Sequence, residues 1–351
     1  MMPVSPELPS NLRAALERIC HGRSRKALGV LAAAQSQNYR AGGGSHTIDT
    51  EDQALAYALT RLPATYAAAS AALTHLREAL PEFRPTSLTD VGAGPGTASF
   101  AAVETFSTLS EIRLFDANPY FRALASRLTQ TAESAALRKA SYRLGDVLTL
   151  LSEPAAAPAD LVIASYVASE MPQGEITHLA KALWAATAAA LLVVEPGTPA
   201  GYARIMTIRN ALIPVGAPDS AHAARDTAHD GDYNEVPGIY VAAPCPHERA
   251  CPLTGSDWCH FAQRLPRLRD HLQVKGVSVP FEDEKFCFVA FSRLPPTRID
   301  ARVLAPPVVT KGAITSKLCT PEGLLQDIAA RRDGITYRRR KDWRWGDAVT
   351  R

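Results

Sequence analysis

The stretch Ser87–Ser99 constrains the fold more than any other part of the chain. It reads Ser-Leu-Thr-Asp-Val-Gly-Ala-Gly-Pro-Gly-Thr-Ala-Ser, so an apolar run ends in three glycines at alternate positions. Leu88 and Val91 are typical of a buried parallel strand, and the residues from Thr97 onward predict an opening helix. The stretch is therefore predicted to be a strand followed by a glycine turn and a helix N-terminus. In such an arrangement, main-chain N–H groups and the positive end of the helix dipole favour the binding of an anionic group of a ligand.

The glycine spacing indicates which cofactor to expect. A nicotinamide-binding turn has the pattern Gly-x-Gly-x-x-Gly, but here Thr97 stands where the third glycine would be. The observed pattern is acid-x-Gly-x-Gly-x-Gly, formed by Asp90, Gly92, Gly94 and Gly96. It resembles the first motif of class I S-adenosylmethionine-dependent methyltransferases. The resemblance implies that the glycine turn contacts the methionine moiety of S-adenosylmethionine.

Two further acids follow the next two predicted strands. Asp116 ends the run that begins at Ile112, and Asp146 follows the run from Tyr142 to Gly145. The same resemblance implies that an acid after the second strand holds the ribose hydroxyls and that adenine binds after the third. The alternative interpretation is that both carboxylates only cap helices, as Asp commonly does.

Strands and helices alternate from Leu88 to Glu195, which predicts a parallel sheet covered on both faces. A later pair of segments predicts an antiparallel hairpin at the sheet edge. The expected fold is therefore α/β: a class I methyltransferase, Rossmann-like doubly wound sheet with N-terminal helices and a C-terminal Cys-rich metal-binding extension. The predicted strands are 87–91, 111–116, 141–145, 159–165 and 190–195, the predicted helices are 97–107, 119–135, 174–189 and 200–213, and the hairpin pairs 274–279 with 285–293.

At 351 residues the chain is longer than one typical domain, so additions around the core are expected. An N-terminal helical region, broken at Pro63, precedes an S-adenosylmethionine-binding core. A mobile loop with a Cys-rich segment and the edge strands come next. The last part carries a fourth cysteine, a short helix from Pro321 to Arg331 and a basic tail. These regions are 1–80, 81–214, 215–262, 263–295 and 296–351.

The longest apolar run, Ala182–Val194, is too short to cross a membrane, so no membrane association is expected. The N-terminus lacks the apolar core of a secretory signal peptide, which favours a cytoplasmic protein. Five of the six cysteines lie in the last third of the chain. This distribution is more typical of a metal site in a reducing compartment than of a disulfide framework.

Three of these cysteines are clustered at Cys245, Cys251 and Cys259. Their spacing matches neither a zinc knuckle nor the pattern of radical S-adenosylmethionine enzymes. Three thiolates in an irregular, Pro-rich loop can still converge on an iron–sulfur centre or on zinc, because both prefer sulfur ligands. The alternative is a set of buried thiols. Spacing does not select the fourth ligand from the candidates Cys319, His247, His260 and Cys287.

Seven basic and two acidic residues lie between Arg331 and Arg344, interleaved with aromatic side chains. Arginine grips phosphates and aromatic rings stack on unpaired bases, so this tail is a candidate RNA contact. The alternative is a solvated tail or a helix held by cation–π stacking. The residues expected to contact RNA are Arg338, Arg339, Arg340, Lys341, Trp343 and Arg344.

Taken together, the chain resembles the family of methyltransferase-like protein 17, small-ribosomal-subunit assembly factors found in mitochondria and bacteria. The resemblance implies S-adenosylmethionine binding, a [4Fe-4S] cluster on Cys245, Cys251, Cys259 and Cys319, and association with the small ribosomal subunit through its rRNA. In a eukaryote it implies a mitochondrial location. The stretches that carry it are 57–66, 90–98, 194–199, 245–261, 281–286, 318–320 and 345–347.

Whether the chain methylates rRNA is left open by the segment after the fourth predicted strand, Ser165–Glu170. It lacks the prolines of the motif with which many N-methyltransferases hold a target base, so Tyr166 and Glu170 are weak catalytic candidates. No cysteine between Cys20 and Cys245 could serve as the nucleophile of a cytosine C-methyltransferase. Two functions remain: an rRNA methyltransferase, or an inactive assembly factor that uses the fold and the cluster as an RNA-binding scaffold or sensor.

Overall fold

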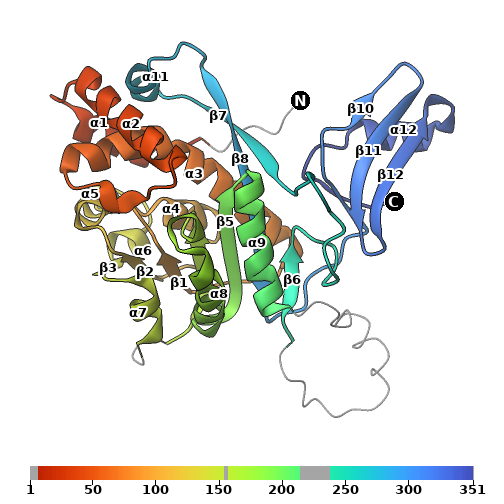
Figure 1. The fold of residues 1–351 in the computed structure, drawn as a ribbon, viewed down its shortest axis with the longest axis horizontal. Coiled ribbons are helices and arrows are strands. Elements are labelled where there is room, and N and C mark those ends of the chain that lie inside the picture. The colour runs from red at the N-terminus through yellow and green to blue at the C-terminus, as the bar shows by residue number, and fades with distance from the viewer. Residues whose placement is uncertain (1–6, 154–156, 214–237, 351) are drawn as a thin grey trace.

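The computed structural model describes residues 7–153, 157–213 and 238–350. Figure 1 shows N-terminal helices, a large twisted sheet with helices on both faces, and a smaller sheet near the C-terminus.

Helices α1 (Ser10–Cys20), α2 (Arg25–Arg40), η1 (Ser45–Thr47, a 3-10 helix) and α3 (Glu51–Ala79) precede the first strand. The predicted break at Pro63 is wrong, because α3 continues through this residue. Its neighbours Leu62 and Ala64 are buried with it, so tertiary packing outweighs the hydrogen bond that proline cannot make. Within the described ranges, no helix combines the length and hydropathy that a bilayer-crossing segment requires.

The large sheet has the strand order β3-β2-β1-β4-β5-β8-β6, and β7 also pairs with β8. Strands β1 to β5 are parallel, whereas β8 is antiparallel to both β5 and β6. This topology confirms the class I methyltransferase fold predicted for the core. The bounds are β1 Ser87–Val91, β2 Glu111–Asp116, β3 Ser141–Leu144, β4 Ala159–Ser165, β5 Thr187–Pro196, β6 Tyr240–Ala243, β7 Phe261–Pro266 and β8 Phe281–Ser292.

Alternate residues of β5 face opposite layers of helices. Leu192 and Val194 pack into the core that contains α3, α4 and α5, whereas Leu191 and Val193 pack into the core that contains α8 and α9. Both faces are therefore covered, as the strand–helix alternation predicts. The helix bounds are α4 Thr97–Thr105, α5 Pro119–Thr129, α6 Ala135–Arg138, α7 Val147–Ser152, α8 Ile176–Ala185 and α9 Pro199–Leu212.

The predicted edge hairpin is wrong in its first strand. The strand that precedes β8 in the chain and pairs with it is β7, whereas the first two residues of the predicted 274–279 strand belong to helix α11 (Arg269–Lys275). Helix α11 ends at Gly276, whose φ of 64° suits a glycine C-cap. The predicted loop 215–243 lies mostly outside the described residues, and its last four residues form β6.

The smaller sheet has the order β10-β11-β9-β13, and β12 also pairs with β11. The predicted helix from Pro321 to Arg331 is wrong, because β12 runs antiparallel to β11 along its whole length. In β12, Leu325 and Ala329 face inward while Gln326 and Ile328 face outward, a period of two. The bounds are β9 Ala301–Val303, β10 Val308–Val309, β11 Ala313–Thr320, β12 Gly323–Ala330, η4 Arg331–Asp333, α12 Ile335–Lys341 and β13 Ala348–Val349.

Candidate functional site

The glycine turn lies at the carboxyl end of β1, between the ends of β2 and β4. Gly92, Gly94 and Gly96 have φ angles of 64°, 52° and 83°, a region that favours glycine. Strand order reverses direction at β1 and β4, and ligands of doubly wound sheets bind at such a switch point. Asp90 lies beneath the turn, where its carboxylate accepts hydrogen bonds from Ser99 N (3.1 Å) and Ser99 Oγ (2.7 Å). Asp90 therefore holds the first turn of α4 to β1.

Asp116 braces the turn from the end of β2. Its Oδ2 accepts a hydrogen bond from Gly94 N at 2.8 Å, and its Oδ1 accepts one from Asn118 N at 2.8 Å. Tyr142 Oη donates to the carbonyl of Gly94 at 2.9 Å. Burial raises the pKa of Asp116, although the backbone N–H donors oppose this effect. The structure thus brings the predicted cofactor residues Asp116 and Gly94 into direct contact.

Asp146 is exposed and caps helix α7. Its Oδ1 accepts hydrogen bonds from Thr149 N at 3.0 Å and Thr149 Oγ1 at 3.1 Å. The preceding residue, Gly145, donates its N–H to the carbonyl of Asp116 at 3.1 Å. The contacts of Asp146 are therefore those of a helix cap, at a position that follows the end of β3 and adjoins β2.

Tyr166 and Glu170 follow β4, and each is held by residues from outside the parallel core. Tyr166 has a φ of 64°, which is a strained conformation for a bulky residue. Its Oη donates to Glu284 Oε1 at 2.9 Å, and Arg61 Nη2 lies 3.3 Å from the same oxygen. Sequence reasoning missed this cluster, although Arg61 and Glu284 both fall in stretches that carry the family resemblance.

Glu170 is bound instead to the segment between α2 and α3. Its Oε2 accepts hydrogen bonds from Ser45 N at 2.9 Å and Ser45 Oγ at 2.6 Å. Its Oε1 accepts one from Tyr39 Oη at 3.3 Å. The two weak catalytic candidates therefore bond to different partners.

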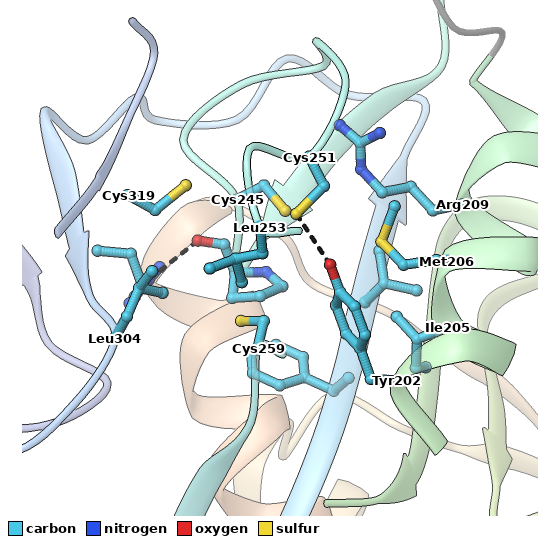
Figure 2. Close-up of a pocket in the computed structure, with 14 residues that line it drawn as sticks. Tyr202, Ile205, Met206, Arg209, Cys245, Cys251, Leu253, Cys259, Leu304 and Cys319 are labelled. Carbon is cyan, nitrogen blue, oxygen red and sulfur yellow. Dashed lines mark hydrogen bonds between the residues drawn. The ribbon is translucent and has the colours of Figure 1, made fainter. Parts of the chain in front are cut away.

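Four cysteines line one pocket between the large and the small sheets. Cys245, Cys251 and Cys259 come from the chain between β6 and β7, and Cys319 comes from β11. Figure 2 shows them around the same space, whose volume is about 30 Å³. Tyr202 of α9 lies with its Oη 3.1 Å from Cys251 Sγ. All six cysteines of the chain are free thiols.

The other candidates for the fourth ligand are His247, His260 and Cys287. In the described part of the chain, none of them lines this pocket. His247 Nε2 lies 3.6 Å from Cys319 Sγ, so this ring adjoins the pocket. The ring of His260 stacks on Trp258, with the centroids 5.0 Å apart. Cys287 is buried in β8, as its alternating pattern predicts.

Two buried arginines face the four thiols. Arg209 Nη2 donates to the carbonyls of His247 (3.3 Å) and Arg249 (2.6 Å). Arg302 donates to the carbonyls of Pro244 (3.0 Å) and Gly346 (2.8 Å). Both guanidinium groups thus hold the Cys-rich backbone and place positive charge beside sulfur.

Burial is the main influence on the thiols. It raises the pKa of Cys245, and the charge of Arg209 opposes this rise. Burial also raises the pKa of Cys259 and of Cys319. These thiols are therefore protonated at neutral pH unless a metal replaces the protons. In the described ranges, no group of three or more His, Cys, Asp or Glu side chains has the arrangement of a metal site.

The basic tail is only partly free to bind a ligand. Arg340 is buried, because its Nε lies 2.8 Å from Asp327 Oδ2 and its guanidinium stacks 4.2 Å from the Trp343 ring centroid. The prediction that Arg340 contacts RNA is therefore wrong, because Arg340 is buried and stacks on Trp343 as the cation–π alternative expects. Trp343 is half-buried, and its contact with RNA stays a prediction. Arg338, Arg339 and Lys341 are exposed, and Arg344 is half-buried.

Comparison with known proteins supplies the family context. Residues 51–350 match the family model described as "Mitochondrial small ribosomal subunit Rsm22". A human protein, "Ribosome assembly protein METTL17, mitochondrial", is 29% identical over 308 residues, which cover 86% of this chain and 63% of that protein. The chain thus spans slightly less than two thirds of this relative's length.

Solved methyltransferase structures are similar at low identity. Magnesium protoporphyrin IX methyltransferase from Synechocystis, with bound S-adenosylmethionine, has a TM-score of 0.38 and 11% identity, covering 82% of this chain and 98% of that one. Human N-acetylserotonin methyltransferase, also in complex with S-adenosylmethionine, has a TM-score of 0.34 and 16% identity, covering 54% of each chain.

Proposed function

The chain belongs to the family described as mitochondrial small ribosomal subunit Rsm22, and on this basis we propose that it is a methyltransferase-like factor of the small ribosomal subunit. It binds S-adenosylmethionine and contacts the rRNA of that subunit. The observation that carries the proposal is the glycine turn at the switch point of the sheet, together with family membership. It acts in the cytoplasm of a bacterium or, as the name of the human relative indicates for that protein, in the mitochondrion of a eukaryote.

The residues around the turn fit the cofactor. Gly92, Gly94 and Gly96 carry no side chain, so a cofactor can approach the backbone of the turn closely. The Asp116 carboxylate accepts one bond at each oxygen and keeps acceptor capacity for ribose hydroxyls. Asp146, which follows β3, is the proposed neighbour of the adenine. The cofactor supplies an electrophilic methyl group, and these side chains bind and orient it.

Calorimetry with S-adenosylmethionine and S-adenosylhomocysteine tests cofactor binding. The variant Gly94→Asp should abolish it, because the φ of 52° strains any side chain at this position and the variant adds a negative charge to the residue whose N–H binds the Asp116 carboxylate. Gly22→Asp is a matched control, since Gly22 also has positive φ but lies in an open turn with nothing near its Cβ position. Equal binding by wild type and Gly94→Asp would contradict the proposed cofactor site.

We propose rRNA methylation as the activity, with an inactive assembly factor as the alternative. The alternative is favoured by one observation: Tyr166 Oη and the Glu170 carboxylate are already bonded to protein groups. Mapping methylated nucleotides in small-subunit rRNA from cells that carry Gly94→Asp separates the two. A modification that disappears supports the enzyme, whereas an unchanged map combined with defective subunit assembly supports the scaffold.

We also propose that Cys245, Cys251, Cys259 and Cys319 hold a [4Fe-4S] cluster, with zinc as the alternative. The donor set supports this proposal, because four thiols line one pocket beside two buried arginines that would offset the negative charge of a thiolate-bound cluster. The cluster would tie the Cys-rich segment to β11, so its role would be structural or sensory.

Anaerobic purification followed by absorbance, iron, sulfide and zinc assays tests the cluster. Cys251→Ser should lower the iron content, whereas Cys287→Ser, a buried thiol in β8, should not. Colourless protein with stoichiometric zinc would contradict the cluster and support the alternative ion.

For the rRNA contact, the exposed residues Arg338, Arg339 and Lys341 are the appropriate ones to change. Their joint replacement by Ala should weaken binding to small-subunit rRNA and flatten its salt dependence, because fewer counterions are released. Arg340 is kept in this variant, since it is buried and holds the tail through Asp327 and Trp343. An unchanged salt slope would argue against RNA contact here.

A further inference from the structure

The segment from Gly42 to Ile48, which joins α2 to α3, is attached at two separate points of the core; we name it the strap. On one side, Asn118 Nδ2 donates to the carbonyls of Ser45 (3.2 Å) and Ile48 (2.9 Å). On the other side, Ser45 donates both its N–H and its hydroxyl to Glu170 Oε2.

The strand order of the large sheet shows which part of the molecule lies between these two attachments. Asn118 follows the carboxyl end of β2, and Glu170 follows the carboxyl end of β4. Strand β1 lies between β2 and β4, so a segment bonded to both must cross the edge where the β1 glycine turn lies. The strap therefore spans the place where the cofactor is proposed to bind.

The strap approaches Glu170 closely at Gly44 and is anchored in the core at Ile48. A Cβ at Gly44 would lie 3.0 Å from Glu170 Oε2, so a side chain there would push against the carboxylate. Gly42 has a φ of 85°, which allows the chain to leave α2 sharply. Ile48 is only 3% exposed and fixes the strap where α3 begins.

The bonds to Glu170 are the weaker attachment. The hydrogen bonds between Ser45 and Glu170 are exposed to solvent, whereas the bond from Asn118 to Ile48 is buried. Water competes for exposed hydrogen bonds, so segments held by them open at low cost. The Glu170 side therefore opens first.

We propose that the strap is the outer wall of the S-adenosylmethionine site, and that the Glu170–Ser45 bonds hold it closed over the bound cofactor. This inference rests on the proposed cofactor binding. Glu170 is then a positioning residue that acts through the strap.

The strap can be tested by measuring the rates at which S-adenosylhomocysteine associates with and dissociates from surface-immobilised protein. Glu170→Gln and Ser45→Ala each weaken the attachment, so both rates should rise by about five- to tenfold, as expected for the net loss of one solvent-exposed hydrogen bond. Glu175→Gln is the matched control, because Glu175 lies nearby and its ion-pair partner is His178 rather than the strap.

Hydrogen exchange supplies a second readout. The amides of residues 42–48 should exchange more slowly with S-adenosylhomocysteine bound, and this protection should shrink in Glu170→Gln. Cofactor binding with unchanged rates in both variants and unchanged exchange in the strap would overturn the strap while leaving the proposed cofactor site intact. Failure of the wild-type protein to bind either S-adenosylmethionine or S-adenosylhomocysteine would overturn both.

Discussion

The buried carboxyl group of Glu195 makes stability depend on pH in a predictable way. Glu195 lies on β5 with no solvent exposure, and Arg204 Nη1 is 3.7 Å from its Oε2. Burial raises the pKa of Glu195 from 4.5 to about 8, and the charge of Arg204 opposes this rise. The folded protein therefore binds this proton more tightly than the unfolded chain does.

The sign and size of the pH dependence of the free energy of unfolding follow from this difference in pKa. Because the folded-state pKa is raised, the stability from this group is fully present below pH 4.5 and is lost as pH rises toward about pH 8. The whole loss is of the order of 5 kcal/mol, and roughly 2.5 kcal/mol of it falls between about pH 5 and pH 7. Glu195→Gln keeps the shape of the side chain and cannot ionise, so it should lose this part of the pH dependence.

Urea unfolding of the wild type and Glu195→Gln, followed across this pH range, measures the effect. The free energy of unfolding of the variant should fall less steeply with rising pH. Glu82→Gln, whose side chain is 96% exposed, is the control and should follow the wild type. A Glu195→Gln profile parallel to that of the wild type would refute the assignment of a high pKa to this carboxyl group.

Three further predictions concern stability. Arg340→Ala should lower the free energy of unfolding by about 2 kcal/mol, because it leaves the half-buried carboxylate of Asp327 without its partner. Arg339 is exposed, so Arg339→Ala should change it by less than about 0.5 kcal/mol in the same urea titration. Gly92→Ala should lower the melting temperature more than Gly94→Ala, since both have positive φ but only the first would place a Cβ 2.4 Å from a side-chain carbon; equal shifts would contradict this packing. Burial raises the pKa of Asp90 to about 7, so Asp90→Asn should flatten the loss of stability between about pH 4 and pH 7, as chemical denaturation at several pH values can check.

Local patterns were enough to predict the parallel core. Its strands are short apolar runs separated by helices, and the turn from Gly92 to Gly96 identifies both the first strand and the proposed ligand-binding edge. Each of these signals lies within about 15 residues of sequence, so no long-range contact is needed to read them.

The errors occurred where distant packing outweighs local preference. Pro63 is a helix breaker in isolation, but α3 buries the residues around it. Residues 323–330 could form a helix alone, but β11 offers them a partner along their whole length. Arg340 was assigned to RNA because its charge is visible in the sequence, whereas its partner Asp327 is recognised only after β12 is placed.

The candidate sites divide in the same way. The candidate side chains, such as Cys245 and Asp116, could be proposed from the cluster of cysteines, the acid that ends the second predicted strand and the family resemblance. The groups that surround them could not, because Arg209, Arg302 and Ser45 come from elements far away in the chain.

Strand β13 and the residues just before it connect the C-terminal segment to the thiol pocket. Ala348 and Val349 pair with β9, and the carbonyl of Gly346 receives the guanidinium of Arg302, which lines the thiol pocket. Clipping these few residues with a carboxypeptidase should therefore speed the alkylation of the pocket cysteines. For the same reason, an affinity tag for purification is better fused ahead of α1 than behind β13.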